Sequence, residues 1–254
     1  MFIEGEFLIL FMLFLIAMLY SSVGHGGASG YLAILSLTIY AEYDSGWLKQ
    51  HAWALNLVVA AIAFYHYKKA GFFNLKLTFP FILASIPFAI IGGYMKVDGV
   101  FYDTLLSITL VWAAYKLLQV KEIYSTIEFQ VPSLRYAVPI GGGIGLMSGF
   151  IGVGGGIFLS PILLLKKWAD PKTAAATAAL FIWVNSMAGL VGAGISGQLV
   201  IQMDILFPFV IAVLLGGYIG AKYGSENARQ ALIRKLLIVV LIIASLKRIS
   251  YLLV

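Results

Sequence analysis

The sequence predicts an all-α polytopic membrane protein in which two inverted repeats each combine a re-entrant, glycine-tipped hairpin with three transmembrane helices. Three observations support this fold class: the composition, two pairs of short apolar segments around glycine-rich breaks, and a second half that repeats the first. Of the 254 residues, 61% are hydrophobic and only 11% are charged, whereas soluble domains have roughly 45–50% apolar and about 25% charged residues. The composition therefore excludes a disordered chain and a typical soluble enzyme.

Residues that bind metals or nucleic acids are absent or scattered. The chain has no cysteine, which excludes disulfides and cysteine-ligated metals, and its three histidines, His25, His51 and His66, are too dispersed for a metal site. The net charge is +6, but the basic residues stand singly at segment ends, whereas nucleic-acid binding needs a clustered basic patch. All 11 Asp and Glu lie in loops or at segment ends, which argues against a buried carboxylate relay. We expect no metal, cofactor or nucleic acid.

Apolar segments follow one another along the chain. A helix needs about 20 consecutive apolar residues to cross the hydrocarbon core. Those that approach this length are residues 48–66, 76–95, 103–119, 173–195, 204–222 and 231–253. Four are shorter, namely 7–20, 31–40, 136–148 and 157–167. They form two pairs around the glycine-rich breaks at 21–30 and 149–156. We therefore expect each pair to fold as a hairpin with a glycine tip.

The second half repeats the order of features in the first. The matches are Gly24-His25-Gly26-Gly27 with Gly152-Val153-Gly154-Gly155, Asn56 with Asn185, Phe79-Pro80-Phe81 with Phe207-Pro208-Phe209, Gly92-Gly93-Tyr94 with Gly216-Gly217-Tyr218, and Lys116 with Lys247. Because these matches keep their order at a nearly constant offset, we interpret them as a duplication. The chain divides into a first repeat at 1–119, a linker at 120–134 and a second repeat at 135–254.

The basic residues indicate that the two repeats are inverted. If each hairpin enters and leaves on one face, 13 of the 17 Lys and Arg residues lie on one face and 4 on the other, whereas fully spanning pairs would give 8 and 9. Since short cytoplasmic loops are rich in Lys and Arg, the linker is expected in the cytoplasm and both termini outside. A hairpin plus three crossings inverts the second half, so the two tips meet near the bilayer centre, as in transporters with broken helices.

The glycine tips are the candidate anion-binding site. Glycine lets a ligand approach the backbone, and a loop that leads into a helix presents free N–H groups and the positive end of the helix dipole. The candidate substrate-binding residues are Gly24, His25, Gly26, Gly27, Asn56, Gly152, Gly154, Gly155, Thr177 and Asn185. The alternatives are close helix packing by the glycines, interhelical hydrogen bonds by the asparagines and a structural role for His25.

The second tip and the helix after it resemble the TauE/SafE sulfite exporter family. Residues 152–161, GVGGGIFLSP, are similar to the family signature GxGGGxxxxP, and residues 170–177 with Asn185-Ser186 resemble the following helix. The resemblance implies a multi-pass exporter of sulfite or a small organosulfur anion such as sulfoacetate in the cell (inner) membrane, with the anion and lipid as partners and no enzymatic activity. It leaves the exact substrate, the coupling ion, the direction of transport and homodimer formation open. His25 replaces the residue matched by Val153, and Leu48 stands where Thr177 stands in the second half, so we expect an asymmetric site.

Two other functions remain as alternatives. Gly27-Ala28-Ser29-Gly30 matches the GxSG string of rhomboid intramembrane proteases, but the second half does not repeat the serine, and no small-residue motif surrounds a base histidine. An intramembrane serine protease is therefore the less favoured alternative. A passive anion channel stays open, because the sequence does not separate a channel from a carrier.

Overall fold

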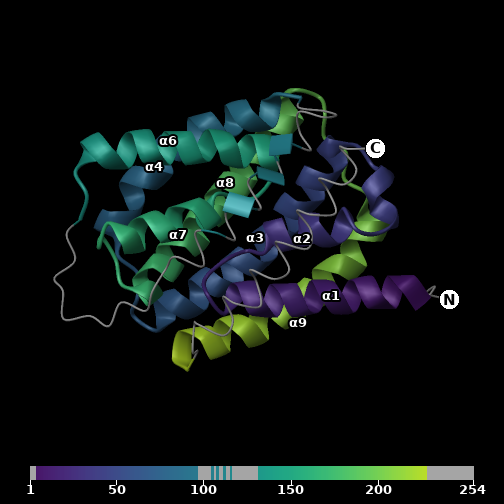
Figure 1. Ribbon diagram of the computed structural model, residues 1–254, viewed down its shortest axis with the longest axis horizontal. Coiled ribbons are helices and arrows are strands. Elements are labelled where there is room, and N and C mark those ends of the chain that lie inside the picture. The colour runs from purple at the N-terminus through teal and green to yellow at the C-terminus, as the bar shows by residue number, and fades with distance from the viewer. Residues whose placement is uncertain are drawn as a thin grey trace.

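The computed structural model describes residues 4–96, 104–105, 107–108, 111–112, 115 and 131–227. Within these ranges each half follows one order, two helices joined by a glycine-rich turn and then two long helices (Figure 1). The first half contains α1 (Glu4–Ser21), α2 (Ala28–Leu35), the 3-10 helix η1 (Ile39–Glu42), α3 (Ser45–Lys69) and α4 (Leu75–Tyr94). The second half contains α6 (Leu134–Ile151), α7 (Gly156–Leu165), α8 (Pro171–Ile195) and α9 (Met203–Glu226).

The described elements are all helical, and this confirms the predicted all-α membrane architecture. Four of them, α4, α6, α8 and α9, are long and apolar enough to cross a membrane. The helices α1 and α6 have 18 residues each and are longer than the predicted segments 7–20 and 136–148. α1 begins earlier, at Glu4, and includes one residue of the expected break, whereas α6 begins at Leu134 and continues three residues into the expected break, to Ile151. The segment 231–253, most of 103–119, the linker residues 120–130, Lys116 and Lys247 lie outside the described residues.

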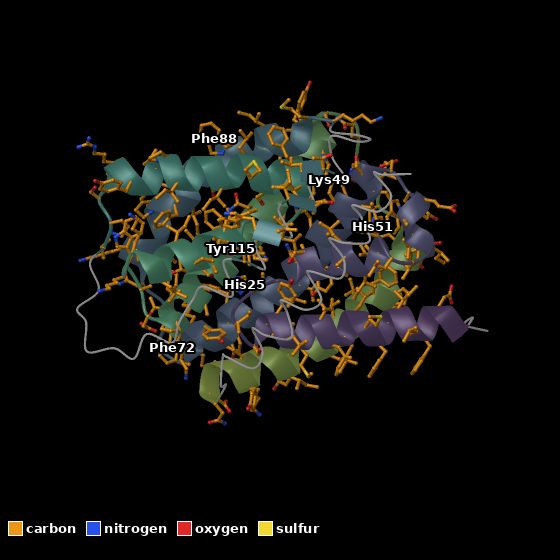
Figure 2. All side chains as sticks on the ribbon, viewed as in Figure 1. His25, Lys49, His51, Phe72, Phe88 and Tyr115 are labelled. Carbon is orange, nitrogen blue, oxygen red and sulfur yellow. The ribbon has the colours of Figure 1, made fainter. Side chains whose placement is uncertain are left out.

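Apolar side chains cover the outer surface of the helices. Phe88 of α4 is 44% exposed and Phe207 of α9 is 64% exposed. Figure 2 shows Phe88 near the edge of the helices and His25 between them. Large exposed apolar surfaces mark contact with a membrane or a partner, and here they lie on helices of membrane-spanning length. The exterior is therefore suited to lipid.

The two long central helices begin at matched aspartate caps. The Asp44 side chain accepts a hydrogen bond from the backbone N–H of Trp47 at 2.7 Å, and the Asp170 side chain accepts from those of Lys172 and Thr173 at 2.9 and 3.0 Å. Such caps satisfy N–H groups that the first helical turn leaves unpaired. They fix the starts of α3 and α8, and with them the register of the helices that carry the candidate asparagines.

A stripe of glycines on α6 brings this helix close to α4. Gly141, Gly145 and Gly149 recur every four residues and so lie on one face of the helix. A Cβ atom at Gly141 would lie 2.6 Å from the carbonyl oxygen of Phe81, and one at Gly149 would lie 2.6 Å from that of Ala89. Small residues allow helix backbones in membranes to approach this closely. The hairpin arm of the second half is thereby fixed to a long helix of the first.

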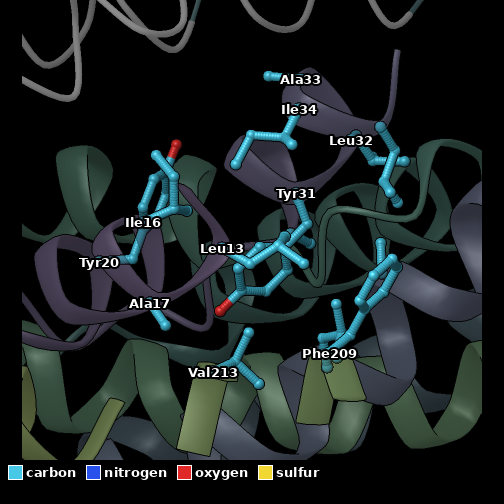
Figure 3. Close-up of a cluster of buried hydrophobic side chains, with 14 of the residues drawn as sticks. Leu13, Ile16, Ala17, Tyr20, Tyr31, Leu32, Ala33, Ile34, Phe209 and Val213 are labelled. Carbon is cyan, nitrogen blue, oxygen red and sulfur yellow. The ribbon is translucent and has the colours of Figure 1, made fainter. Parts of the chain in front are cut away.

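A second stripe, on α9, does the same for α1. Gly216 and Gly220 face the backbone of α1, and Gly224 faces the backbone just beyond its end, where a Cβ atom at Gly224 would lie 2.5 Å from the Cα of Ser22. Buried side chains extend this contact. Figure 3 shows Leu13, Ile16, Ala17 and Tyr20 of α1 and Tyr31 of α2 beside Phe209 and Val213 of α9. The hairpin of the first half is therefore packed against a helix of the second.

The contacts also give the directions in which the helices run. In the successive contacts between α4 and α6, between α1 and α9, and between α3 and α9, the residue numbers of both helices rise together, so the helices of each pair run parallel. They rise together along α4 and α8 as well. In contrast, Asn56 contacts Ser186 and Trp53 contacts Gly189, so α3 and α8 are antiparallel. The described long helices thus form two sets, with α1, α3 and α9 running one way and α4, α6 and α8 the other.

Candidate functional site

The first glycine tip lies against the start of α7, directly after the second glycine tip, inside the protein. The first tip is residues 22–27 between α1 and α2, and the second is residues 152–155 between α6 and α7. The Nε2 atom of His25 lies 3.3 Å from the carbonyl oxygen of Gly156 and 3.2 Å from the Oγ of Ser160. Its Nδ1 atom lies 3.0 Å from the carbonyl oxygen of Val23. His25 is 7% exposed, so one buried imidazole joins the first tip to the start of α7.

Both tips require glycine for their backbone conformation. The φ angles of Gly24, Gly27, Gly152, Gly154 and Gly155 lie between +72° and +103°, a region that residues with a side chain disfavour. Gly27 and Gly155 are the N-cap residues of α2 and α7 and provide no side-chain cap. The first N–H groups of both short helices therefore depend on partners from elsewhere.

Asn56 of α3 supplies such a partner to the first tip and touches the second. Its Oδ1 accepts a hydrogen bond from the N–H of Ala28 at 3.0 Å, and its Nδ2 donates to the Oγ of Ser186 at 3.2 Å. A Cβ atom at Gly154 would lie 2.6 Å from Nδ2, and one at Gly26 would overlap Oδ1. The amide of Asn56 thus lies between the tips and positions the first of them.

Asn185, its sequence match, has a different environment. Its Nδ2 donates to the carbonyl oxygen of Phe181 in its own helix at 2.8 Å. Its Oδ1 is buried without a hydrogen-bond partner among the described residues. The match in sequence therefore does not extend to the contacts.

Thr177 lies on a different side of α8 from the tips. Its hydroxyl forms a hydrogen bond with that of Thr78 at 3.0 Å, and Thr78 donates to the carbonyl oxygen of Asn74 at 2.8 Å. The described hydrogen bonds of Thr177 therefore connect α8 to α4, and the structure does not bring it together with the other candidates.

The remaining candidate glycines contact the long central helices. A Cβ atom at Gly24 would lie 2.5 Å from the Cα of Ala175 in α8, and one at Gly152 would lie 2.6 Å from the Cβ of Lys49 in α3. Sequence reasoning placed Lys49 among the membrane-flanking charges, yet it is 2% exposed. The missed signal is its spacing from Asn56, since residues seven apart share a helix face.

Apolar helices of spanning length that enclose two buried glycine turns define a polytopic membrane protein. The chain belongs to the TauE/SafE sulfite exporter family, whose model matches residues 9–248. It is thus a member of a family of multi-pass membrane transporters, and the resemblance noted at the second tip is confirmed.

Individual relatives agree with this assignment. The chain is 35% identical over 238 residues, covering 92% of this chain and 94% of the relative, to the probable membrane transporter protein y4hK of Sinorhizobium fredii (strain NBRC 101917 / NGR234). It is 31% identical over 87 residues, covering 34% of this chain and 30% of the relative, to the probable membrane transporter protein YunE of Bacillus subtilis (strain 168). A comparison with solved structures found no match.

Proposed function

We propose that the protein carries a small oxyanion, sulfite or an organosulfonate such as sulfoacetate, across the cell (inner) membrane and binds it where the two glycine tips meet. The observation that carries this proposal is the buried contact of His25 with Gly156 and Ser160, which joins the first tip to the start of α7, directly after the second tip. Each tip leads into a short helix whose N-terminus favours an anion. The acidic residues that the structure describes lie in loops or at helix ends, so fixed negative charge does not oppose an anion at the tips.

The two halves form an inverted repeat in this proposal. Support comes from the helix directions, because each long helix of the first half runs opposite to the helix at the same place in the second half: α1 opposite to α6, α3 to α8 and α4 to α9. Support for a re-entrant hairpin comes from the hydrogen bond of 2.8 Å between Tyr20 and Ser29. This bond holds the start of α2 against the end of α1, as expected where the chain turns back.

The amide of Asn56 between the tips favours a carrier over a channel. An anion that passes between the tips requires Gly26 and Gly154 to move away from this amide, because the amide contacts both. Separation toward one face at a time is alternating access, which inverted repeats support. The proposed mechanism is therefore binding at the junction followed by opening to either side.

The experiment is counterflow in vesicles that contain the purified protein, with labelled sulfite outside and unlabelled sulfite, sulfate, thiosulfate or sulfoacetate inside. Unlabelled substrate inside should accelerate uptake, because exchange through alternating access is faster than net flux. Gly154→Val should abolish uptake, since φ is +72° and a Cβ atom there would lie 2.6 Å from the Nδ2 of Asn56. Gly197→Val is the matched control, because Gly197 has φ of +70° and nothing within 4 Å of its Cβ position.

Two results would contradict the proposal. Uptake by Gly154→Val at the wild-type rate would place the substrate path elsewhere. Failure of every oxyanion in the panel to accelerate uptake would remove the assigned substrate class.

A further inference from the structure

We propose a second oxyanion-binding subsite on the face of α3 that carries Lys49, Trp53 and Asn56, with the indole N–H of Trp53 as its directed donor. It rests on the proposed function, because it extends the central anion site toward the end at which α3 begins. The three residues are spaced by four and three positions and therefore lie on one face of the helix. All three carry N–H donors, and their exposed fractions are 2%, 0% and 0%.

Trp53 is the observation that points to a ligand. Its Nε1 atom is buried and has no hydrogen-bond partner among the described residues. An indole N–H can only donate, and leaving a buried donor unpaired costs free energy. Atoms of the same ring lie 2.6 to 3.0 Å from the Cβ position of Gly189 in α8. An oxyanion at this place would supply the acceptor that the described part of the chain does not.

Lys49 adds positive charge beside this donor. Its Nζ atom lies 5.7 Å from the centroid of the Trp53 ring and donates to the carbonyl oxygen of Met95, just beyond α4, at 3.2 Å. A buried ammonium group next to an N–H donor suits an anion and disfavours a cation. The subsite is therefore specific for negatively charged ligands.

The second tip runs along the same face of α3. The Cβ position of Gly152 lies 2.6 Å from the Cβ of Lys49, and that of Gly154 lies 2.6 Å from the Nδ2 of Asn56. Trp53 stands between these two contacts in the helix. The subsite is thus continuous with the junction of the tips, and an anion can move between them along the donors of one helix.

The second half shows that the fold itself does not require these residues. With the offset that matches Asn56 to Asn185, the positions that correspond to Lys49 and Trp53 are Ala178 and Ile182. Neither side chain can donate a hydrogen bond. The subsite therefore belongs to one of the two access routes only, the one that opens where α3 begins, and it breaks the symmetry of the repeat.

A structural role for Lys49 is the competing explanation, and the chain offers a control for it. Lys172 of α8 donates to the carbonyl oxygen of Ser225 near the end of α9 at 2.8 Å and lies 4.9 Å from the centroid of the Phe72 ring. It makes the same two kinds of contact as Lys49 without an unpaired donor beside it. Trp47 is the control for Trp53, because its Nε1 donates to the Oε1 of Gln202 at 3.0 Å.

The test is equilibrium binding of radiolabelled sulfite and sulfate to the purified full-length protein in detergent. Trp53→Phe keeps the ring and removes only the N–H, so the dissociation constant should rise by roughly tenfold or more, as for a lost hydrogen bond to a charged group. Its thermal stability should be unchanged or higher, because a buried unpaired donor is gone. Trp47→Phe should show the opposite pattern, with lower stability and wild-type affinity.

Lys49→Met should also weaken binding and reduce its dependence on salt, because it removes an attracting charge, whereas Lys172→Met should not. Wild-type affinity in Trp53→Phe would overturn the subsite and leave the central site standing. If the wild-type protein itself binds no oxyanion, the proposed function fails, and the subsite fails with it.

Discussion

Leucine substitutions at Asn56 and Asn185 should have unequal effects, although the two residues are matched in the repeat. In Asn56→Leu the N–H of Ala28 and the hydroxyl of Ser186 both lose a partner. A buried donor left unpaired costs about 1–3 kcal/mol, and a side-chain hydrogen bond within a membrane contributes about 0.6 kcal/mol on average. The expected loss in the free energy of unfolding is therefore about 2–4 kcal/mol.

Asn185→Leu removes much less. The carbonyl oxygen of Phe181 loses the side-chain amide but keeps the backbone N–H that α8 provides. The substitution also removes an Oδ1 atom that is buried without a partner among the described residues. Stability should therefore change by no more than about 1 kcal/mol in either direction, and transport should persist.

The assay is reversible unfolding in mixed micelles with increasing dodecyl sulfate, followed by near-ultraviolet circular dichroism, together with uptake in vesicles. Ser186→Ala provides an intermediate case, because it removes one hydrogen bond of Asn56 and leaves the bond to Ala28 intact. Equal losses in Asn56→Leu and Asn185→Leu, or a larger loss in the latter, would refute the view that Asn56, and not Asn185, positions a tip.

Two further predictions concern packing and topology. Gly141→Ala should destabilise the protein by about 1–3 kcal/mol through overpacking, since the new Cβ would lie 2.6 Å from the carbonyl oxygen of Phe81. Gly143→Ala is the control and should stabilise α6 slightly, because nothing lies within 4 Å of its Cβ position. Equal melting temperatures of the two variants would contradict the role of the glycine stripe in packing. Because the chain has no cysteine, a single cysteine placed at residues 121–130 or next to either terminus is a unique site for a membrane-impermeant thiol reagent. A cysteine in the linker should react from the cytoplasm, and one at either terminus should react from outside. Termini on opposite faces would rule out the inverted arrangement.

The path of the backbone could be predicted from the sequence because local patterns determine it. Glycines recur where φ is positive, and aspartates stand where α3 and α8 begin. These features depend on residues that are close together in the sequence, so they can be recognised from the sequence alone. The length of α6 was underestimated because Gly149, which was read as the start of the break, continues the helix.

The partners of polar side chains could not be predicted in the same way. α8 packs against α3, α4 and α7, and its position in the chain does not decide which neighbour a residue faces. Thr177 therefore bonds to α4, whereas Ser186 bonds to Asn56 of α3. The burial of Lys49 could not be predicted for a related reason. A single charge near the end of a segment resembles a membrane-flanking charge until the helix face that it shares with Trp53 is known.

The two halves contribute different things to the protein. The first half supplies the side chains that act across the junction, because His25 reaches the carbonyl oxygen of Gly156 and Asn56 contacts both tips. The second half has Val153 at the position of His25, and its Asn185 bonds within its own helix.

The second half instead supplies the two glycine stripes, on α6 and α9, that hold the halves together. Both stripes pack backbone against backbone, a contact that tolerates little change in distance. In the proposed carrier, opening at the tips therefore comes from the short helices and the turns between them, while the pairs α4/α6 and α1/α9 move as units. On this view a substitution at Asn56 changes the proposed site, whereas a substitution at Gly141 changes how the two halves pack together.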